Sequence, residues 1–249
     1  MIAKTPPTEF SSRDQALVIF RYPFLIRVLL CKNPFHVIFL TTAPLSIVCA
    51  WMARSSAVSW PKTLAAIGIG VAYWSLFEYA VHRWLYHTAF RLRPWRNFIE
   101  SLHLYHHRRL GDPRVLNAGP LLTYPLLACL LAPVHFSSGL DTAFTGLVGL
   151  GILGYYTFYE FVHYGIHYRI FRGGYLRMIQ RYHLFHHEGS HWGTNFGNTS
   201  PLWDRLLGTY DPAWRAYEIS SHMRATLIAA KLISSCPEIR STPDQAGAP

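Results

Sequence analysis

The sequence predicts an all-α integral membrane protein with four transmembrane helices and a cytoplasmic helical cap. Three observations predict this fold class: the composition is apolar, long stretches carry no formal charge, and ten of the 14 histidines fall in four tight clusters. Of the 249 residues, 51% are hydrophobic and only 14% are charged, and the mean hydropathy is +0.13. This composition excludes a soluble acidic protein and a disordered one.

Four runs with almost no charged residues are long enough to cross a bilayer, which takes about 20 helical residues. Within them, Glu78 lies near the end of the second run and Glu160 near the end of the fourth. The expected spans cover residues 34–53, 63–81, 115–139 and 142–162. We expect one membrane domain over residues 34–215, preceded by a segment at 1–33 and followed by a tail at 216–249.

The basic residues predict the orientation, because Lys and Arg near the ends of spans stay on the cytoplasmic side. Of the 23, five precede the first span, two lie between the first and second, seven lie between the second and third, and nine follow the fourth. Both termini and residues 82–114 are therefore expected in the cytoplasm, and the bacterial inner membrane and the endoplasmic reticulum both stay open. Residues 1–10 lack the apolar region of a cleavable secretory signal, so the first span is expected to act as the signal. The net charge of +10 suits an anionic membrane face, and nucleic-acid binding would not explain four spans.

The histidine clusters have helical spacings. Positions i, i+3 and i+4 share one face of an α-helix, so each triplet and the second pair can aim their imidazoles at one point. His82 and His87 are five residues apart and need an offset or a kinked helix. The four clusters are His82 and His87; His103, His106 and His107; His163 and His167; and His183, His186 and His187.

The clusters occur in two copies. His87 and His103 are 16 residues apart, as are His167 and His183, and the two pairs are offset by 80 residues. The motif HLYHH in the first half is answered by HLFHH in the second. We infer two copies of one unit with five imidazoles each, which suggests two metal ions or one binuclear site, a dimetal site held in the cap. Imidazole suits Fe, Zn, Cu and Ni, and without a C-x2-C pair neither an iron–sulfur cluster nor a closed structural zinc site is expected.

Further polar residues lie close to the clusters in the sequence. Glu78 and Glu160 can each accept the distal N–H of a ligand histidine, or pair with an arginine. Asp112 and Asp204 are further candidates of the same type. His191 is either an eleventh ligand or a structural residue. The segment around Asn195, Gly197 and Trp203–Asp204 is expected to form a turn and a short amphipathic piece that closes over the site.

At these residues the sequence resembles the membrane fatty acid hydroxylase and sterol desaturase superfamily. The resemblance covers most of residues 70–210, and its four ordered motifs look most like those of the fatty acid 2-hydroxylases of sphingolipid metabolism: FEYAVHRWLYH, HLYHHRRLGDPR, LGYYTFYEFVHYGIHYR and YHLFHHEGSHWGTNFGNTSPLWDRLLGTY. It implies a dimetal centre of two Fe ions, with Zn possible in isolated protein, that uses O2 to oxidise an unactivated C–H bond of a lipid. The metal ligands it implies are His82, His87, His103, His106, His107, His163, His167, His183, His186 and His187.

The resemblance therefore implies a non-haem di-iron lipid monooxygenase that hydroxylates a fatty acyl or sphingolipid chain taken from the bilayer. The His-Pro-Gly-Gly motif of a fused cytochrome b5 is missing, so electrons are expected from a separate cytochrome b5-like or ferredoxin-like protein. The sequence departs from the 2-hydroxylases at Tyr168 and over residues 188–198. Several arginines can contact anionic headgroups or the electron donor, or can simply satisfy the positive-inside rule: Arg83, Arg91, Arg93, Arg96, Arg108 and Arg109.

Alternative functions use the same residues. A sterol C-5 desaturase, a carotenoid hydroxylase or an alkylglycerol monooxygenase would have the same ligand set, because hydroxylation and desaturation share the first hydrogen abstraction. A membrane metal transporter is the alternative that is not an enzyme. It would place its ligands near the bilayer midplane, whereas these clusters lie at or beyond the cytoplasmic ends of the spans.

Overall fold

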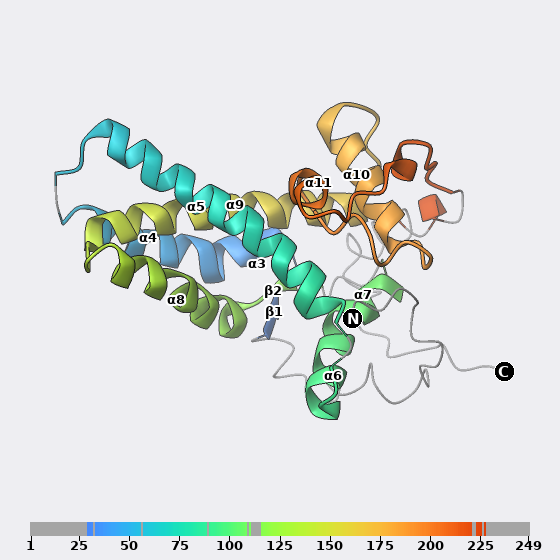
Figure 1. Ribbon diagram of the computed structural model, residues 1–249, viewed down its shortest axis with the longest axis horizontal. Helices are drawn as coiled ribbons and strands as arrows, with labels where there is room; N and C mark the ends of the chain where they lie inside the picture. The colour runs from blue at the N-terminus through green and yellow to red at the C-terminus, as the bar shows by residue number, and fades with distance from the viewer. Residues whose placement is uncertain are drawn as a thin grey trace.

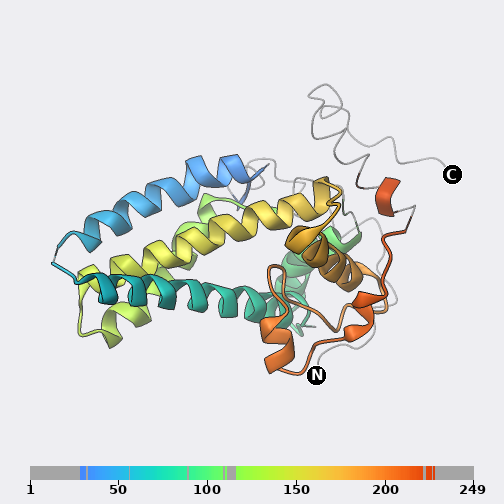
Figure 2. The same ribbon diagram turned by 90° about the horizontal axis from the view of Figure 1, so that it is seen from above.

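The computed structural model describes residues 29–220, except 32, 56, 89, 109 and 111–115, together with 223–225 and 227. Most of the expected terminal segments, 1–33 and 216–249, and the candidate Asp112 lie outside the described residues. The described chain is mostly helical, with connecting loops and one antiparallel pair of two-residue strands, β1 (Leu30–Cys31) and β2 (Asn117–Ala118). The predicted helical architecture is confirmed. Figures 1 and 2 show a bundle of long helices that leads into a cap of short helices and loops.

The bundle contains three of the four expected spans as long apolar helices. Among the described residues, three helical stretches are long and apolar enough to cross a membrane: Pro34–Ala53, Trp60–Tyr86 and Pro120–Ser137. The first joins α3 (Pro34–Val37), the π-helix η1 (Ile38–Thr42) and α4 (Ala43–Ala53); the second joins α5 (Trp60–Ala80) to the π-helix η2 (Val81–Tyr86); and the third is α8 (Pro120–Ser137). The third is shorter than expected because residues 117–118 form β2 and Gly119 is extended.

The fourth expected span falls on α9 (Thr142–Tyr168), which has 27 residues and continues beyond residue 162. It begins where the side chain of Asp141 accepts a hydrogen bond from the Phe144 amide, 2.9 Å away, and it ends at the extended residue Arg169. It is not among the three apolar stretches, because glycines and tyrosines occupy many of its positions. Its crossing of the membrane stays a prediction, as does the cytoplasmic side of the cap.

The helix α9 is the centre of the bundle. It packs against α4, α5 and α8, and its glycines allow close approach of the backbones. A methyl group on Gly151 would collide with the carbonyl oxygen of Ile67, and one on Gly146 would collide with that of Cys49. Beside these contacts Trp74 and Tyr156 pack with their ring centroids 4.7 Å apart. This packing holds α5 and α9 against each other within the bundle, and the two helices diverge toward the cap (Figure 2).

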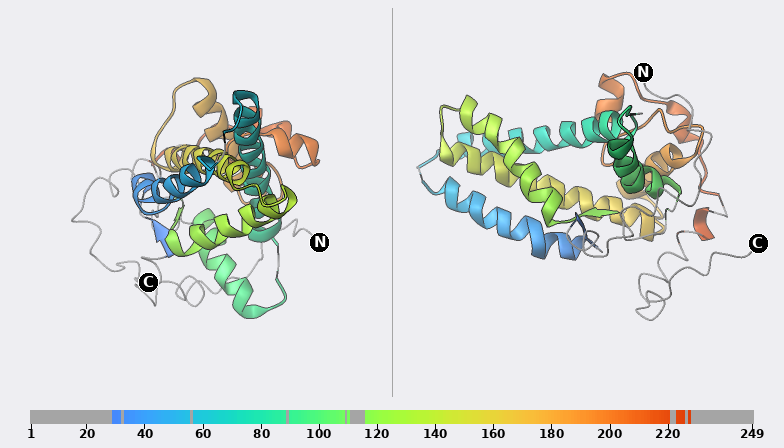
Figure 3. Two further views of the ribbon diagram at one scale, coloured as in Figure 1. Left: turned by 90° about the vertical axis from the view of Figure 1, so that its left-hand side faces the viewer. Right: turned by 90° about the horizontal axis from the view of Figure 1, so that it is seen from below.

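The cap is formed by short elements from both halves of the chain, gathered at one end of the bundle (Figure 3). Its second half has a core in which α10 packs against the end of α9 and against Trp214. The elements of the cap are α6 (Arg93–Ile99), the π-helix η3 (Glu100–Leu104), α7 (Tyr105–Arg108), α10 (Gly174–His187), α11 (Leu202–Leu206) and the 3-10 helix η5 (Pro212–Arg215).

Candidate metal centre

The first histidine pair is aligned by a π-helix. The π-helix η2 continues α5 with hydrogen bonds from residue i to i+5, which brings residues five apart onto nearly the same side. His82 lies within it and His87 follows its last residue, and their ring centroids are 5.1 Å apart. The offset predicted from the five-residue spacing is thus confirmed.

The other clusters lie on helices that converge on the same place. His103 is on η3 and His106 and His107 are on α7, while the second pair is on the last turns of α9 and the second triplet is on α10. Nine of the ten side chains are buried, and His87 is half-buried. All ten predicted histidines are therefore brought together at the cap end of the bundle.

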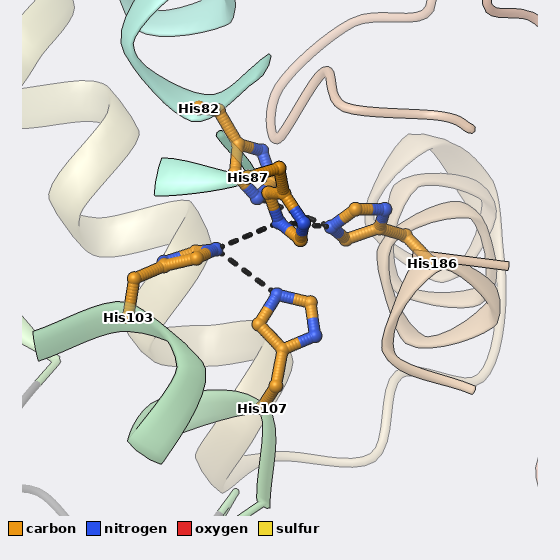
Figure 4. Close-up of side chains that lie close together, drawn as sticks. All are labelled: His82, His87, His103, His107 and His186. Atoms are coloured by element: carbon orange, nitrogen blue, oxygen red, sulfur yellow. Dashed lines mark hydrogen bonds between the residues drawn. The ribbon is translucent and has the colours of Figure 1, made fainter. Parts of the chain in front are cut away.

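The ring nitrogens form two compact groups. In each group every member offers one nitrogen within 4.8 Å of the others. The first group, drawn in Figure 4, contains His82, His87, His103, His107 and His186. The second contains His106, His167, His183 and His187.

Within the groups the Nε2 atoms point at one another. In the first group the Nε2 atom of His103 lies 3.0 Å from those of His87 and His107, and in the second that of His183 lies 3.1 Å from that of His167 and 2.9 Å from that of His187. The groups touch: the rings of His107 and His187 stack with centroids 4.0 Å apart. The two groups therefore form one continuous histidine cluster rather than two distant ones.

The two halves of the chain exchange one histidine. His186, from the second half, joins four histidines of the first half, and His106, from the first half, joins three of the second. Each half supplies five of the ten imidazoles, but the two groups do not divide along the halves. These are the middle histidines of the two triplets, on the side of each helix that faces the opposite half. Neither group is complete without the other half.

His163 lies at the edge of the second group. Its ring centroid is 4.9 Å from that of His167, 5.0 Å from that of His183 and 5.2 Å from that of His106. Its Nδ1 atom is buried without a hydrogen-bond partner among the described residues. His163 corresponds in the duplication to His82, which belongs fully to the first group.

Two histidines have their tautomer fixed by the loop that follows α10. The Nδ1–H of His82 donates to the carbonyl of Phe196, and that of His186 donates to the carbonyl of Thr194, 2.7 Å away. A neutral imidazole with a proton on Nδ1 presents a lone pair on Nε2. The two Nε2 atoms are 3.1 Å apart, so two lone pairs face each other in a buried place. That contact is repulsive unless a cation lies between them.

Burial keeps the histidines neutral. Loss of hydration is the largest cause that lowers the pKa of the cap histidines well below the usual value, and repulsion by neighbouring imidazoles adds to it. Neutral imidazole is the form that binds metal ions. The affected residues of the cap are His87, His103, His107, His183, His186 and His187.

Glu78 and Glu160 hold backbone segments instead of the histidines. Glu78 accepts from the amide of Asn198 at 3.0 Å and from the hydroxyl of Thr199 at 3.2 Å. Glu160 accepts from the side-chain amide of Asn117 in β2. Both expected partners, a ligand N–H and an arginine, are therefore wrong for the described residues. The loop at residues 198–199 and the strand β2 bind the two carboxylates instead.

Asp204 also holds the loop rather than a histidine. It is fully buried and accepts from the amides of Phe196 and Gly197, both at 2.8 Å, from the hydroxyl of Tyr182 at 2.8 Å and from that of Thr209 at 2.7 Å. Burial raises the pKa of Asp204, and the hydrogen bonds to the carboxylate oppose that rise. The expected closure of residues 195–204 over the site is present, with α11 as its short helix.

His191 has a structural place. Its ring stacks on Phe185 with centroids 3.8 Å apart, its Nδ1 atom is 3.7 Å from a carboxylate oxygen of Asp211, and it belongs to neither group. The interpretation of His191 as a structural residue is favoured over that of an eleventh ligand.

Aromatic residues that the sequence analysis did not single out form the walls of the site. Phe196 is fully buried, and its ring centroid lies 5.3 Å from those of His87 and His186. Trp192 lies 4.9 Å from His107 and donates its indole N–H to the carbonyl of His187 at 3.0 Å. Tyr86 stacks on His103 at 4.5 Å. The only sequence signal for these three aromatic residues is that they lie within or just after the histidine motifs. Such walls exclude water from a reacting centre.

Comparison with known proteins agrees with this geometry. The model of the fatty acid hydroxylase family matches residues 67–209, a range that includes all four histidine clusters. The chain is 32% identical over 168 residues to the dihydroceramide fatty acyl 2-hydroxylase FAH2 of Arabidopsis thaliana, covering 66% of this chain and 69% of that protein. It is 29% identical over 189 residues to the ceramide very long chain fatty acid hydroxylase scs7 of Schizosaccharomyces pombe, covering 74% of this chain and 52% of that protein.

A solved structure shares the fold. It is of full-length Scs7p, in which only the hydroxylase domain is visible, and it matches with a TM-score of 0.63 and 25% identity over 75% of this chain and 68% of that one. The matched family region, the histidine clusters and the fold coincide in one part of the molecule. The chain belongs to the fatty acid hydroxylase family.

Proposed function

We propose that the protein is an O2-dependent lipid hydroxylase whose ten clustered histidines hold two iron ions. The observation that carries the proposal is the convergence of buried, neutral Nε2 atoms from both halves of the chain into two touching groups. The relatives named above act on fatty acyl chains of ceramide or dihydroceramide, which supports a fatty acyl or sphingolipid substrate.

The donor set fits a pair of redox metals. Two nitrogens bound at about 2.1 Å are about 3.0 Å apart when they subtend a right angle at the metal, and about 3.4 Å apart at a tetrahedral angle. The shortest Nε2 to Nε2 distances within the groups are 2.9–3.2 Å, and all the nitrogens of a group lie within 4.8 Å of one another. This spacing supports metal ions with more than four ligands, such as iron, over tetrahedral zinc. His163 would complete the second group with a small movement of its ring.

The chain's own residues orient the site and keep it dry. Two bound iron ions would supply the redox chemistry that breaks an unactivated C–H bond with O2, which no side chain can do. The carbonyls of Thr194 and Phe196 hold His186 and His82 with Nε2 facing inward. Glu78 and Asp204 fix the loop that carries those carbonyls. Phe196 covers the first group and excludes water.

The placement in the membrane follows from the bundle. We propose that α9 crosses the bilayer with the three apolar stretches as a fourth span, within a membrane domain over residues 34–215, and that the cap and both termini are cytoplasmic. The acyl chain would then reach the metals from the bilayer at the cap end of the bundle. Electrons would come from a separate electron-transfer protein that docks on the cytoplasmic face.

Lipid analysis of cells that express the protein tests the proposal. The comparison includes the His106→Ala variant and, as a matched control, His36→Ala, which changes an exposed histidine outside the clusters. We expect hydroxylated acyl or sphingolipid species in the wild type and the control but not in His106→Ala, and about two iron ions per purified wild-type chain. New double bonds would instead assign a desaturase. Changed metal accumulation without a lipid change would assign a transporter, and active protein free of metal would refute the proposal.

A further inference from the structure

A pocket lined by three arginines opens on the cap, away from the histidine groups. Its volume is about 410 Å³, and it is lined by Gly174, Arg177, Met178, Arg181, Trp214 and Arg215. No carboxylate is among these lining residues, and none of the three arginines forms an ion pair with a carboxylate of the described chain. Three guanidinium groups around one pocket repel one another, so the pocket favours an anionic occupant.

The three arginines differ in how far they are already used. Arg181 donates to the carbonyl of Tyr217 at 2.8 Å and to that of Arg215 at 2.7 Å, so it shapes the wall. The guanidinium of Arg215 lies over the rings of Trp214 and Tyr210, 5.9 Å from each centroid. Arg177 makes no side-chain hydrogen bond or ion pair within the described chain, so its charge is available to a partner.

The pocket and the histidine groups share the helix α10. Arg177 and Arg181 are on α10, the helix that carries His183, His186 and His187. Arg177 precedes His183 by six residues, which is about 9 Å along the helix axis. In the floor of the pocket, Trp214 packs edge-on against Tyr182, with centroids 5.4 Å apart, and Tyr182 is the neighbour of His183 in sequence. Aromatic side chains thus connect the pocket to a metal-binding helix. Figure 1 shows α10 in the cap, beyond the cap ends of α5 and α9.

The basic residues at η2 and beside α6 have a different character. Arg91 lies beside Leu92 and Trp95, which are 74% and 45% exposed, and Arg96 is 3.9 Å from Glu100. Basic residues among exposed apolar ones are typical of a segment at a membrane surface. Arg83 is bound to the hydroxyl of Tyr79 and the carbonyl of Leu207. These arginines are therefore poorer candidates for a protein partner than the arginine pocket.

We propose that the arginine pocket is the docking site for an acidic electron-carrier protein, with carboxylates of the carrier seated among Arg177, Arg181 and Arg215. The inference rests on the proposed function, because that reaction takes two electrons from outside the chain. The pocket gives the carrier a complementary charge and a short route to α10. The alternative occupant, an anionic lipid surface, is distinguished by the test.

Binding of an acidic carrier to the full-length, metal-loaded protein in neutral phosphatidylcholine nanodiscs tests the assignment. The probes are a soluble cytochrome b5 domain and an acidic [2Fe–2S] ferredoxin, titrated at low ionic strength, where exposed charges are weakly screened. Arg177→Glu is expected to raise the Kd of the carrier roughly tenfold and to flatten its salt dependence, and Arg177→Lys to restore most of the affinity. The matched control, Arg91→Glu, makes the same charge change beside α6 and should leave the Kd unchanged.

Two further measurements separate this inference from the proposed function. Metal content and hydroxylation driven by a chemical reductant should be the same in Arg177→Glu as in the wild type. Equal carrier affinity in Arg177→Glu and the wild type, or an equal loss in Arg91→Glu, would overturn the docking site. Loss of binding to phosphatidylglycerol vesicles with carrier affinity unchanged would assign the pocket to lipid. If the wild type forms no hydroxylated product with any reductant, the proposed function is refuted. The measured affinity for the carrier would then still decide whether the pocket binds an acidic protein.

Discussion

Asp204→Ala should release the loop that orients the metal-binding histidines. The carboxylate is fully buried and accepts four hydrogen bonds, two of them from the amides of Phe196 and Gly197. The carbonyl of Phe196 in turn accepts the Nδ1–H of His82. The variant therefore acts on stability directly and on the first histidine group through the loop.

The magnitude follows from the donors that lose their acceptor. A buried amide left without a partner costs about 1–3 kcal/mol, so two amides cost about 4 kcal/mol, before any contribution from the hydroxyls of Tyr182 and Thr209. Asp204→Asn keeps the shape and one acceptor oxygen. Because each carboxylate oxygen accepts one amide and one hydroxyl, the asparagine variant should lose about half as much, near 2 kcal/mol.

Thermal unfolding and metal analysis of the purified variants measure both effects. A matched control is Asp141→Ala, which removes the N-cap of α9 at the other end of the bundle. It should lower the free energy of unfolding by about 1 kcal/mol without changing the metal content. We expect stability and bound metal to fall in the order wild type, Asp204→Asn, Asp204→Ala. If Asp204→Ala unfolded like Asp141→Ala and kept all its metal, the role assigned to the loop would be refuted.

Three further results are expected. His106→Ala should lower the metal bound by the second group, and His186→Ala should lower the metal bound by the first group, as measured by metal analysis and spectra. A loss of metal confined to the group formed mainly by the variant's own half would contradict the observed exchange of histidines between the halves. Gly151→Ala should destabilise the bundle by about 2 kcal/mol or more in thermal unfolding because its methyl group meets the Ile67 carbonyl, whereas Gly154→Ala, which meets nothing within 4 Å, should not. Metal-free protein should be most stable above about pH 6.5, the histidine pKa of the unfolded chain, and should lose stability as the pH falls. The reason is that burial lowers the pKa of the cap histidines in the folded protein, so the unfolded chain binds more protons in acid; these are His87, His103, His107, His183, His186 and His187. Unfolding curves that do not change with pH between about 5 and 8 would contradict this.

Local spacing predicted much of the site. The helical spacing predicted that the histidines of each triplet lie close together, and the five-residue spacing of His82 and His87 predicted an offset in the helix, which is found as a π-helix. Helix periodicity acts within about one turn, so these features depend on sequence alone. The apolar runs similarly predicted three of the bundle's helices.

The contacts of the carboxylates could not be predicted in the same way. Glu78 lies one turn before His82, but its partners, Asn198 and Thr199, are more than a hundred residues away in the chain. Which loop reaches a buried carboxylate is decided by tertiary packing. Phe196 was missed for the same reason, since only the folded loop places its ring beside His87 and His186.

The exchange of His106 and His186 explains why the duplicated unit forms one continuous histidine cluster. On α10 the middle histidine, His186, is turned by about 60° from His183 to one side and by about 100° from His187. In the first half His103 lies on η3, and His106 and His107 lie on α7. When two such helices face each other, the first and last histidines stay with their own group while the middle one points across the interface. A single copy would then have too few ligands for its own metal and one ligand for its neighbour's. With the proposed metals bound, the folding of each half would be coupled to that of the other, so loss of one metal should loosen both triplets rather than one.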